Sequence, residues 1–235
     1  DITENKIDLL ILSTSANIRF KLLKFLLNNF NFSNIILEKI VFQNSNHFVL
    51  ANELFKKLNN TKVWINLIRR ENSFYKTIKE KIKNDKLIKV QIYGEDWGLA
   101  CNSLHFIDLI CFLTDSKLSD LDMSGLVPKV FHSKRKGFVE FRGCVKAKLQ
   151  DNTLLTITSS SSNIINNKYI FINLCCEDFN LSIVEGSYPS PFALFHSKVK
   201  PELMEKINFN IDYVSNSTKI IVESLFLGNT CNLPK

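Results

Sequence analysis

Glycine is scarce in this sequence of 235 residues, which has seven, the first being Gly94. These glycines never form G-x-G-x-x-G, the turn that holds a dinucleotide pyrophosphate at a helix N-terminus. The six cysteines include no C-x-x-C pair, so their spacing indicates neither a zinc ribbon nor a disulfide framework. We expect them to be buried thiols in a reducing compartment.

Long hydrophobic runs are missing as well. No window approaches the roughly 18 continuous apolar residues that a membrane helix needs, and the start, DITENKIDLLIL, lacks the basic region and cleavage site of a secretory signal. Hydrophobic residues make up 45% and charged residues 23%, a balance typical of globular domains. We therefore expect a cytoplasmic protein with no membrane partner, built as one large domain or two small ones.

The charge is unbalanced toward lysine and arginine, which exceed aspartate and glutamate by 30 − 23 = 7. Such a surplus can attract nucleic acid. However, the lysines are scattered along the chain, and the one compact basic run, HSKRKG at 132–137, has no aromatic residues interleaved with it. We interpret the surplus as solvated surface and expect no nucleic-acid partner.

Apolar runs and helical periodicity alternate in the first part of the chain. Runs at 7–12, 34–39 and 62–67 are typical of strands buried on both faces, and helical stretches at 13–29 and 46–58 separate them. Strand and helix in this order predict right-handed β-α-β crossovers and a parallel sheet. We assign residues 1–67 to the C-terminal half of a Rossmann-like dinucleotide-binding domain.

The pattern changes after Arg70. Helices are predicted at 74–85, at 101–113 starting with Asn102 and Ser103, and at 213–229 with an apolar stripe that includes Ile220 and Val222. Strands are predicted at 87–94, 138–149, 153–160, 168–176 and 179–186, joined by hairpin-length turns. The predicted fold class is therefore α/β plus α+β: a partial Rossmann-like parallel sheet, then an α+β domain at 68–235 with a large, mostly antiparallel sheet.

Four side chains that can do chemistry lie close together in the stretch GEDWGLACNSLHFIDLICFL: Cys101, Asn102, His105 and Asp108. A lone histidine on an apolar helix is usually a core residue. A metal site is a weaker alternative, because Cys101, His105 and Asp108 are unlike ligands with no fourth nearby, and we predict no metal. Two further candidates, Arg69 and Arg70, suit either a carboxylate or phosphate of a substrate or an inter-domain ion pair.

Five segments in order carry a resemblance to a known family: IDLLILSTSANIR, NIILEKI, VWINLIRR, LACNSLHFIDLICFL and VSNSTKIIVESLFLGNTCNLP. They resemble the glucose-fructose oxidoreductase, inositol dehydrogenase and MocA group (Gfo/Idh/MocA), NAD(P)-dependent sugar oxidoreductases with a Rossmann domain followed by an α/β domain. The segments look like the family's fourth strand and cofactor-facing turn, its Glu-Lys-Pro strand, its inter-domain strand, its histidine helix and its terminal helix. GLACNSLH looks like a sub-branch of nucleotide-sugar and sialic-acid-like pathways.

The resemblance implies roles for particular residues. Lys39 matches the family's catalytic lysine and His105 its histidine, an acid/base pair that would take the hydroxyl proton of an alcohol while hydride leaves for the nicotinamide. It implies cofactor contacts to NAD or NADP at Ser13, Thr14, Ser15 and Glu38, and contacts to a sugar or sugar derivative at Arg70, Asn102 and Asp108. It also implies a homo-oligomer formed through the antiparallel sheet.

The sequence departs from the family pattern in three respects. Ile40 replaces the proline after Glu-Lys, Cys101 replaces an aspartate four residues before the histidine, and the glycine turn of the first Rossmann half does not occur. Apart from the family resemblance, a Glu-Lys pair after an apolar strand is usually a pair of solvated charged residues at the end of the strand. We therefore expect a truncated form of such an enzyme; the alternative is a non-catalytic sugar-binding or oligomerisation remnant.

Overall fold

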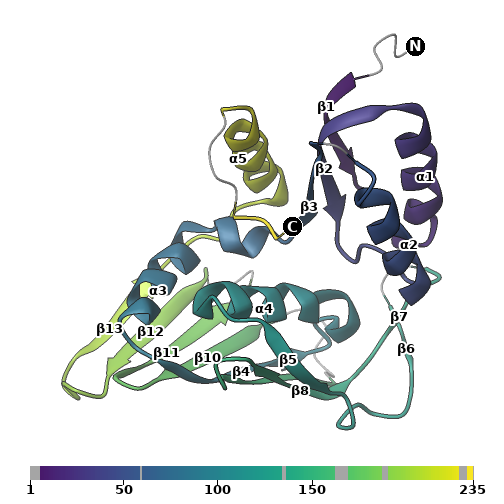
Figure 1. Cartoon of the computed structure of the whole chain (residues 1–235). Helices are drawn as coiled ribbons and strands as arrows, with labels where there is room; N and C mark the ends of the chain where they lie inside the picture. The colour runs from purple at the N-terminus through teal and green to yellow at the C-terminus, as the bar shows by residue number, and fades with distance from the viewer. Residues whose placement is uncertain are drawn as a thin grey trace. The chain divides into compact units, whose positions relative to one another are not determined.

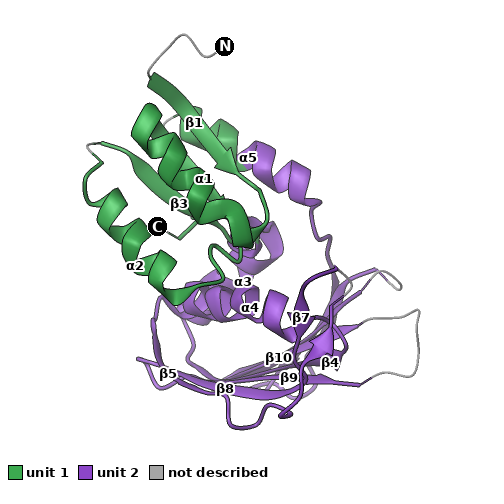
Figure 2. Cartoon of the chain, turned by 90° about the vertical axis from the view of Figure 1, so that its right-hand side faces the viewer, with its two compact units in different colours: residues 1–68, 221–235 green, residues 69–220 purple. Residues whose placement is uncertain are grey.

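A computed structural model describes residues 6–58, 60–133, 136–161, 169–186, 190–227 and 232–234. Lys134 and Arg135 of the basic run, and Cys231, lie outside these residues. The chain divides into two compact units (Figure 2), residues 1–68 with 221–235 as unit 1 and residues 69–220 as unit 2. The last turns of the chain therefore belong to the same unit as its beginning.

Unit 1 contains a three-stranded parallel sheet with strand order β1-β2-β3. Its elements are β1 (Lys6–Leu12), α1 (Ala16–Asn29), β2 (Asn31–Glu38), α2 (Ser45–Phe55) and β3 (Lys62–Asn66), followed by a 3-10 turn (Ile68–Glu71) and, late in the chain, α5 (Val214–Phe226). The predicted order of strands and helices, and the parallel sheet, are confirmed.

Both faces of strand β2 are buried, which explains its continuous apolar run. Ile35 packs with Leu23 of α1 in one hydrophobic cluster, whereas Ile36 packs with Trp64 and with Ile221 of α5 in another. The apolar stripe predicted for this last helix is wrong at Ile220, which is 46% exposed, because Ile221 is the buried residue; Leu225, also predicted in the stripe, does pack against this cluster. Neighbouring residues of one helix lie about 100° apart around its axis, so an error of one position turns a predicted stripe away from the buried face.

The two edges of this sheet differ. At β3, the backbone N–H of Ile65 donates to the carbonyl oxygen of Pro234 at 2.9 Å, so the C-terminal segment covers that edge. At β1, none of the described residues pairs with the outer side, and Ile11 is 41% exposed. An apolar edge strand of a parallel sheet is normally paired with another strand or covered. Within the described residues neither is seen at the outer edge of β1, so the sheet is open on this side.

Unit 2 contains an eight-stranded sheet with strand order β13-β12-β11-β10-β4-β9-β8-β5. Its strands and helices are α3 (Ser73–Lys83), β4 (Leu87–Glu95), α4 (Leu99–Thr114), β5 (Leu118–Asp122), β6 (Phe131–His132), β7 (Val139–Glu140), β8 (Gly143–Leu149), β9 (Leu154–Ser160), β10 (Ile170–Cys176), β11 (Phe179–Glu185), β12 (Phe192–Ser197) and β13 (Met204–Asn208). Only the β4–β9 pair of this sheet is parallel, so the predicted mostly antiparallel sheet is confirmed. Helices α3 and α4 lie on one face (Figure 1). No described helix is long and apolar enough to cross a membrane.

Some boundaries in unit 2 differ from the prediction. The strand predicted at 138–149 is two strands, β7 and β8, because Gly143 has a φ of 112° and turns the backbone between them. Helix α4 begins at Leu99 instead of Asn102, after Gly98 in the left-handed region at φ 84°. Cys101 in its first turn is exposed, so the expectation that the cysteines are buried is wrong for this residue. Strands β5, β6, β12 and β13 were not predicted.

Candidate functional site

In unit 1, polar residues collect where the parallel strands end. Ser13, Thr14 and Ser15 follow β1, Glu38 ends β2 with Lys39 directly after it, and Asn66 ends β3. Since parallel strands end at the same edge of a sheet, these residues share the position where open α/β sheets bind ligands. The side-chain amide of Asn66 donates to a carboxylate oxygen of Glu38 at 2.7 Å, which joins the ends of β2 and β3.

Arg19 of α1 holds this edge in place. Its guanidinium donates to the carbonyl oxygens of Thr14, Glu38 (2.6 Å), Ile40 (2.5 Å) and Val41 (2.8 Å), and the side chain is buried. Burial lowers its pKa, and the charge of Glu38 partly offsets that effect. One side chain therefore connects the turn after β1 to the segment after β2, where the peptide bond between Lys39 and Ile40 is cis.

Three buried polar atoms at this edge have no hydrogen-bond partner among the described residues. They are the hydroxyl oxygen of Thr14, the Nε of Arg19 and the side-chain oxygen of Asn66. Buried polar atoms are normally paired, so unpaired ones indicate a place where a ligand or water completes the bonding. Hydroxyl, amide and carboxylate groups of this kind fit the ribose and nicotinamide end of a dinucleotide, whereas no described residue supplies a glycine turn for its pyrophosphate.

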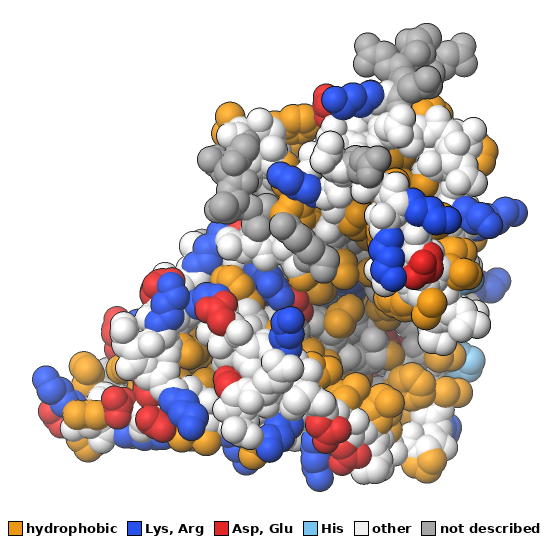
Figure 3. All heavy atoms as spheres, viewed as in Figure 1, with side chains coloured by type: hydrophobic (Ala, Val, Ile, Leu, Met, Phe, Trp, Pro, Cys, Tyr) orange, Lys and Arg blue, Asp and Glu red, His pale blue; other side chains and the backbone are white. Residues whose placement is uncertain are grey.

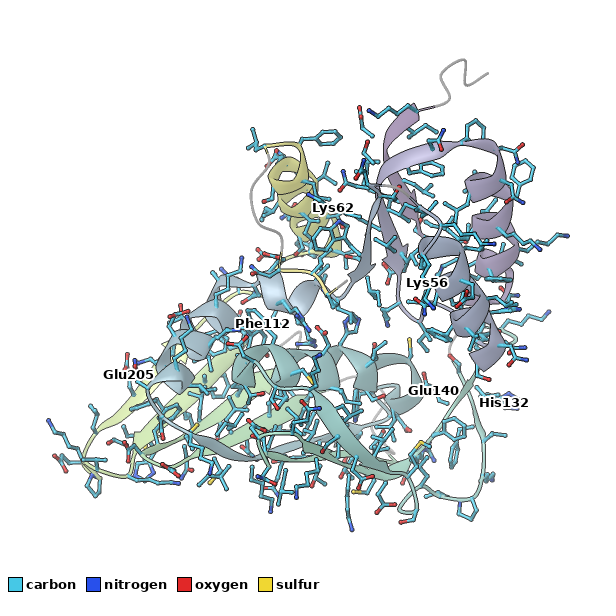
Figure 4. All side chains as sticks on the ribbon, in the orientation of Figure 1. Lys56, Lys62, Phe112, His132, Glu140 and Glu205 are labelled. Atoms are coloured by element: carbon cyan, nitrogen blue, oxygen red, sulfur yellow. The ribbon has the colours of Figure 1, made fainter. Side chains whose placement is uncertain are left out.

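In unit 2, helix α4 carries the second group of candidates. A carboxylate oxygen of Glu140 on β7 accepts from the backbone N–H of Ala100 at 2.8 Å (Figure 4), which satisfies an N–H of the first helical turn. The side-chain amide of Asn102 donates to the carbonyl oxygen of Trp97 at 2.8 Å. The start of α4 is therefore stabilised by a distant strand and by the turn before it.

His105 lies in the second turn of α4 and is partly buried, one helical turn after Cys101. No group of His, Cys, Asp and Glu within the described ranges is arranged to hold a metal ion. Lys39 belongs to unit 1 and His105 to unit 2, so each unit presents one member of the predicted acid/base pair. Their joint action remains a prediction.

Arg70 and Asp108, both predicted to bind substrate, are bonded to each other. The Nε of Arg70 donates to Oδ2 of Asp108 at 2.6 Å, and Nη2 donates to Oδ1. Burial raises the pKa of Asp108, while Arg70 acts in the opposite direction. The pair lines an open hollow of about 420 Å³ on unit 2, together with Leu104, Ile107 and Cys111, whereas His105 does not line it.

Arg69 forms a second buried ion pair, also within unit 2. Its guanidinium donates to both carboxylate oxygens of Glu185, at 2.5 and 2.8 Å, and stacks 4.2 Å above the ring of Phe106. The hydroxyl of Tyr75 donates to the same carboxylate. Burial lowers the pKa of Arg69, but Glu185 and Tyr75 together outweigh this effect and the net change is upward. The sequence left two alternatives for Arg69, a substrate contact or an inter-domain ion pair. The structure shows an ion pair, and both of its residues belong to unit 2.

Sequence reasoning missed four residues that organise these groups: Arg19, Asn66, Glu140 and Glu185. Two of them carried a signal. Arg19 lies four residues before the buried Leu23, so it occupies a core position of the helix. Glu185 continues the alternation of Phe179, Leu181 and Ile183, which all point inward. A charged residue at a position where the repeat has apolar residues is expected to be buried, and it therefore predicts a buried partner for the charge.

Comparisons with known proteins show the fold. No protein-family model matches this sequence, and a search of curated proteins finds no match. Among solved structures, the transcriptional regulator Gal80p from Kluyveromyces lactis matches with a TM-score of 0.72 and 16% identity over 93% of this chain. An oxidoreductase from Sinorhizobium meliloti matches with 0.70 and 11% identity over 94%. UDP-N-acetylglucosamine 3-dehydrogenase GnnA from Acidithiobacillus ferrooxidans matches with 0.66 and 10% identity over 94%.

The structures that this chain matches include proteins described as oxidoreductases and dehydrogenases, together with the transcriptional regulator Gal80p, so the fold that the predicted resemblance implies is confirmed. At these identities the likeness shows the fold alone. The chain spans 65% of the length of the Gal80p structure, 68% of the Sinorhizobium meliloti oxidoreductase and 70% of GnnA. Activity, substrate and cofactor therefore remain to be proposed.

Proposed function

We propose that this chain is the larger part of an NAD(P)-dependent oxidoreductase that transfers hydride to or from a sugar or sugar derivative. The observation that carries the proposal is the fold, which matches oxidoreductases over 94% to 97% of the chain. The neighbour GnnA is described as a UDP-N-acetylglucosamine 3-dehydrogenase. A nucleotide sugar is accordingly the first substrate class to test.

Each proposed role rests on a position in the fold. Ser13, Thr14, Ser15 and Glu38 lie at the ligand-binding edge of the parallel sheet and would hold the cofactor, which accepts or supplies the hydride. Lys39 directly follows Glu38 at this edge and would exchange the proton of the substrate hydroxyl. Histidine side chains can exchange protons near neutral pH, and His105 would share that proton. The bonded pair Arg70 and Asp108, with Asn102, would bind hydroxyl groups of the sugar.

The open edge of β1 supports the truncation. A dinucleotide-binding domain of the Rossmann type has a six-stranded sheet, and its glycine turn follows the first strand. In its described part, unit 1 has three parallel strands, and the outer edge of β1, where Ile11 is exposed, has no strand paired with it. We propose that further parallel strands continue the sheet on this side in the active protein and supply the pyrophosphate turn.

The proposal is tested by an activity assay on the chain extended by the coding sequence upstream of Asp1. Oxidation or reduction of NAD(P) is followed with a panel of sugars and nucleotide sugars. Lys39→Ala and His105→Ala are each expected to lower kcat by a factor of about 100 to 10,000. Matched controls are Lys24→Ala on the exposed face of α1 and His132→Ala on β6, which should keep the activity. Full activity in both test variants would reject these roles.

A second candidate is a non-catalytic protein that keeps the fold for binding a sugar or for assembly. The similarity to Gal80p, described as a transcriptional regulator, favours it. On the face viewed in Figure 3, basic side chains are interspersed with acidic and apolar ones, which does not favour direct nucleic-acid binding.

Calorimetry distinguishes the two candidates. The extended protein is titrated with NADH and NADPH, and separately with nucleotide sugars. Micromolar binding of a dinucleotide that Glu38→Ala weakens supports the oxidoreductase. Sugar binding without any dinucleotide binding or turnover supports the non-catalytic protein.

A further inference from the structure

The open hollow on unit 2 extends beyond the pair of Arg70 and Asp108. Its volume of about 420 Å³ lies within the range of about 300 to 1,000 Å³ that is typical of sites for small molecules. Its apolar lining consists of Leu104, Ile107, Cys111, Phe112 and Leu118, of which Phe112 is labelled in Figure 4. The hollow therefore has the size and the largely apolar lining of a ligand site.

Both carboxylates that line the hollow have cations as partners. Asp108 accepts from Arg70, and Asp115, directly after α4, accepts from Nζ of Lys79. The same Nζ donates to the carbonyl oxygen of Phe112 at 2.7 Å, which fixes Lys79 in place. A positively charged ligand would have to compete with these bonded cations, so the hollow does not favour one.

Lys117 adds a positive charge that is not balanced in this way. It lines the hollow two residues after Asp115, and it forms no ion pair with any residue that the structure describes. With Arg70 and Lys79 it makes three cations against the two carboxylates, a balance of 3 − 2 = +1. A hollow with surplus positive charge attracts anions.

The backbone around Lys117 is fixed by the turn between β8 and β9. The hydroxyl oxygen of Ser116 accepts from the backbone N–H of Asp151 at 3.1 Å. The carbonyl oxygen of Lys117 accepts from the backbone N–H of Gln150 at 2.9 Å. Only the side chain of Lys117 therefore has to become ordered when an anion binds, which limits the entropic cost of binding.

The length of the hollow indicates which kind of anion fits. Asp108 lies about 60° around α4 from His105 and about 4.5 Å further along the helix axis, so this end adjoins the proposed proton carrier. Thr114, the last residue of α4, lies about 14 Å beyond His105 along the axis, and Lys117 follows it. One sugar ring beside His105 does not span this length, whereas a sugar extended by a diphosphate and a nucleoside does.

We propose that the hollow binds the nucleoside diphosphate part of a nucleotide sugar, and that Lys117 determines this specificity by pairing with the diphosphate. The inference rests on the proposed oxidoreductase, because it takes the sugar to lie beside Arg70 and Asp108. Phosphate oxygens accept charge-assisted hydrogen bonds from lysine and arginine. The diphosphate therefore lies between the cations at the two ends of the hollow.

The base has an apolar surface at the far end. Leu118 begins β5, lines the hollow next to Lys117 and is 38% exposed. Bases that proteins recognise outside a helix pack their faces against apolar or aromatic side chains. The order of sugar, diphosphate and base along the ligand thus follows the order of Asp108, Lys117 and Leu118 along the hollow.

Calorimetry on the chain as it stands tests the site with UDP, pyrophosphate and uridine as probes. UDP is expected to bind more tightly than either of the other two, because it alone has both the diphosphate and the base. Lys117→Ala should weaken UDP binding by a factor of about 5 to 10 and leave uridine binding unchanged. Lys86→Ala, an exposed lysine before β4, is the control and should keep the affinity of the unmodified chain for UDP.

Alkylation of cysteines locates the bound probe. Cys111 lines the hollow, whereas Cys144 on β8 does not, and both thiols are partly buried. UDP should slow the alkylation of Cys111 by iodoacetamide, followed by mass spectrometry, and leave the rate at Cys144 unchanged. In the extended protein, Lys117→Ala should raise KM for a nucleotide sugar by the same factor of about 5 to 10 without lowering kcat, because Lys117 lies away from the reacting atoms.

Each contrary result overturns a stated part of the inference. A chain that does not bind UDP, or whose UDP binding survives Lys117→Ala without protection of Cys111, has no such site in the hollow. Pyrophosphate that binds as tightly as UDP rejects the role of the base. Turnover of unphosphorylated sugars with no UDP binding would reject this site and keep the oxidoreductase. UDP binding in the hollow without NAD(P) turnover by the extended protein would keep the site and reject the oxidoreductase.

Discussion

The carboxylate of Glu140 accepts a hydrogen bond from the backbone N–H of Ala100 at 2.8 Å, so a two-residue strand caps the helix that carries His105. The two residues are 40 positions apart in the chain. A negative group at a helix N-terminus satisfies an unpaired N–H and interacts favourably with the helix dipole. The orientation of α4 therefore depends on a side chain outside it.

Replacing this cap should destabilise unit 2. Glu140→Ala is expected to lower the free energy of unfolding by about 1 to 2 kcal/mol, and Glu140→Gln by less because an amide oxygen still accepts. Each unit has one of the two tryptophans, so Trp97 fluorescence in a Trp64→Phe background reports on unit 2 during urea unfolding. Glu205→Ala, an exposed glutamate on β13, should have no effect. Equal stabilities for all three variants would mean that the cap contributes nothing.

Removing Arg19 should loosen the edge of unit 1 at which the parallel strands end. Arg19→Met keeps the apolar stem but leaves the carbonyl oxygens of Thr14, Glu38, Ile40 and Val41 without this donor. We expect a loss of at least about 3 kcal/mol. Hydrogen exchange of β2 amides should accelerate accordingly. Lys24→Met, exposed on the same helix, is the control, and unchanged exchange in Arg19→Met would contradict the role.

The ion pair of Arg69 and Glu185 should show strong coupling. Glu185→Leu leaves a buried guanidinium without its counter-charge, at a cost of about 3 to 5 kcal/mol, and Arg69→Met leaves a buried carboxylate. The double variant is expected to be less destabilised than either single one. Tyr75→Phe removes only one hydrogen bond and should cost about 1 kcal/mol. Additive losses in the double variant would show that the pair is not coupled.

Stability should fall at alkaline pH because of Cys176. Burial raises the pKa of this thiol to about 12 from an ordinary value of 9.0. Between these values the unfolded chain has lost the proton and the folded chain keeps it, so rising pH lowers the free energy of unfolding, by at most about 1.4 kcal/mol per pH unit. Below pH 9.0 this contribution is fully present.

The measurement compares urea unfolding of two alanine variants across this range. The Cys176→Ala variant loses some packing at every pH, but its free energy of unfolding should fall less steeply with rising pH than that of the wild type. Cys175→Ala, whose side chain points to the other face of β10, should keep the wild-type slope. Other groups titrate in both proteins and cancel in the comparison. If the free energy of unfolding fell equally steeply with pH in Cys176→Ala and in the wild type, the raised pKa of Cys176 would be refuted.

The sequence alone determined the elements whose signals are local. Strands β1, β2 and β3 were predictable because each contains a short continuous apolar run, although only β2 is buried on both faces and β1 is largely exposed. Helices α1 and α2 were predictable because their apolar residues repeat at helical spacing. The class of fold followed from the order of these elements. Lys39 and His105 could be singled out only through the family resemblance, because a lysine at a strand end and a histidine on an apolar helix are each common.

Only the tertiary structure decided which distant residues meet. Glu140 caps α4, Asn66 bonds Glu38, and Glu185 pairs with Arg69 across 116 positions. The parallel pairing of β4 with β9, and the division of the last helix between a buried Ile221 and an exposed Ile220, are also long-range results. Periodicity reports whether a side chain is buried but not against what, since the partner is selected by packing of the whole chain. Burial without a partner is costly for charged groups, which is why these pairings hold the candidate sites together.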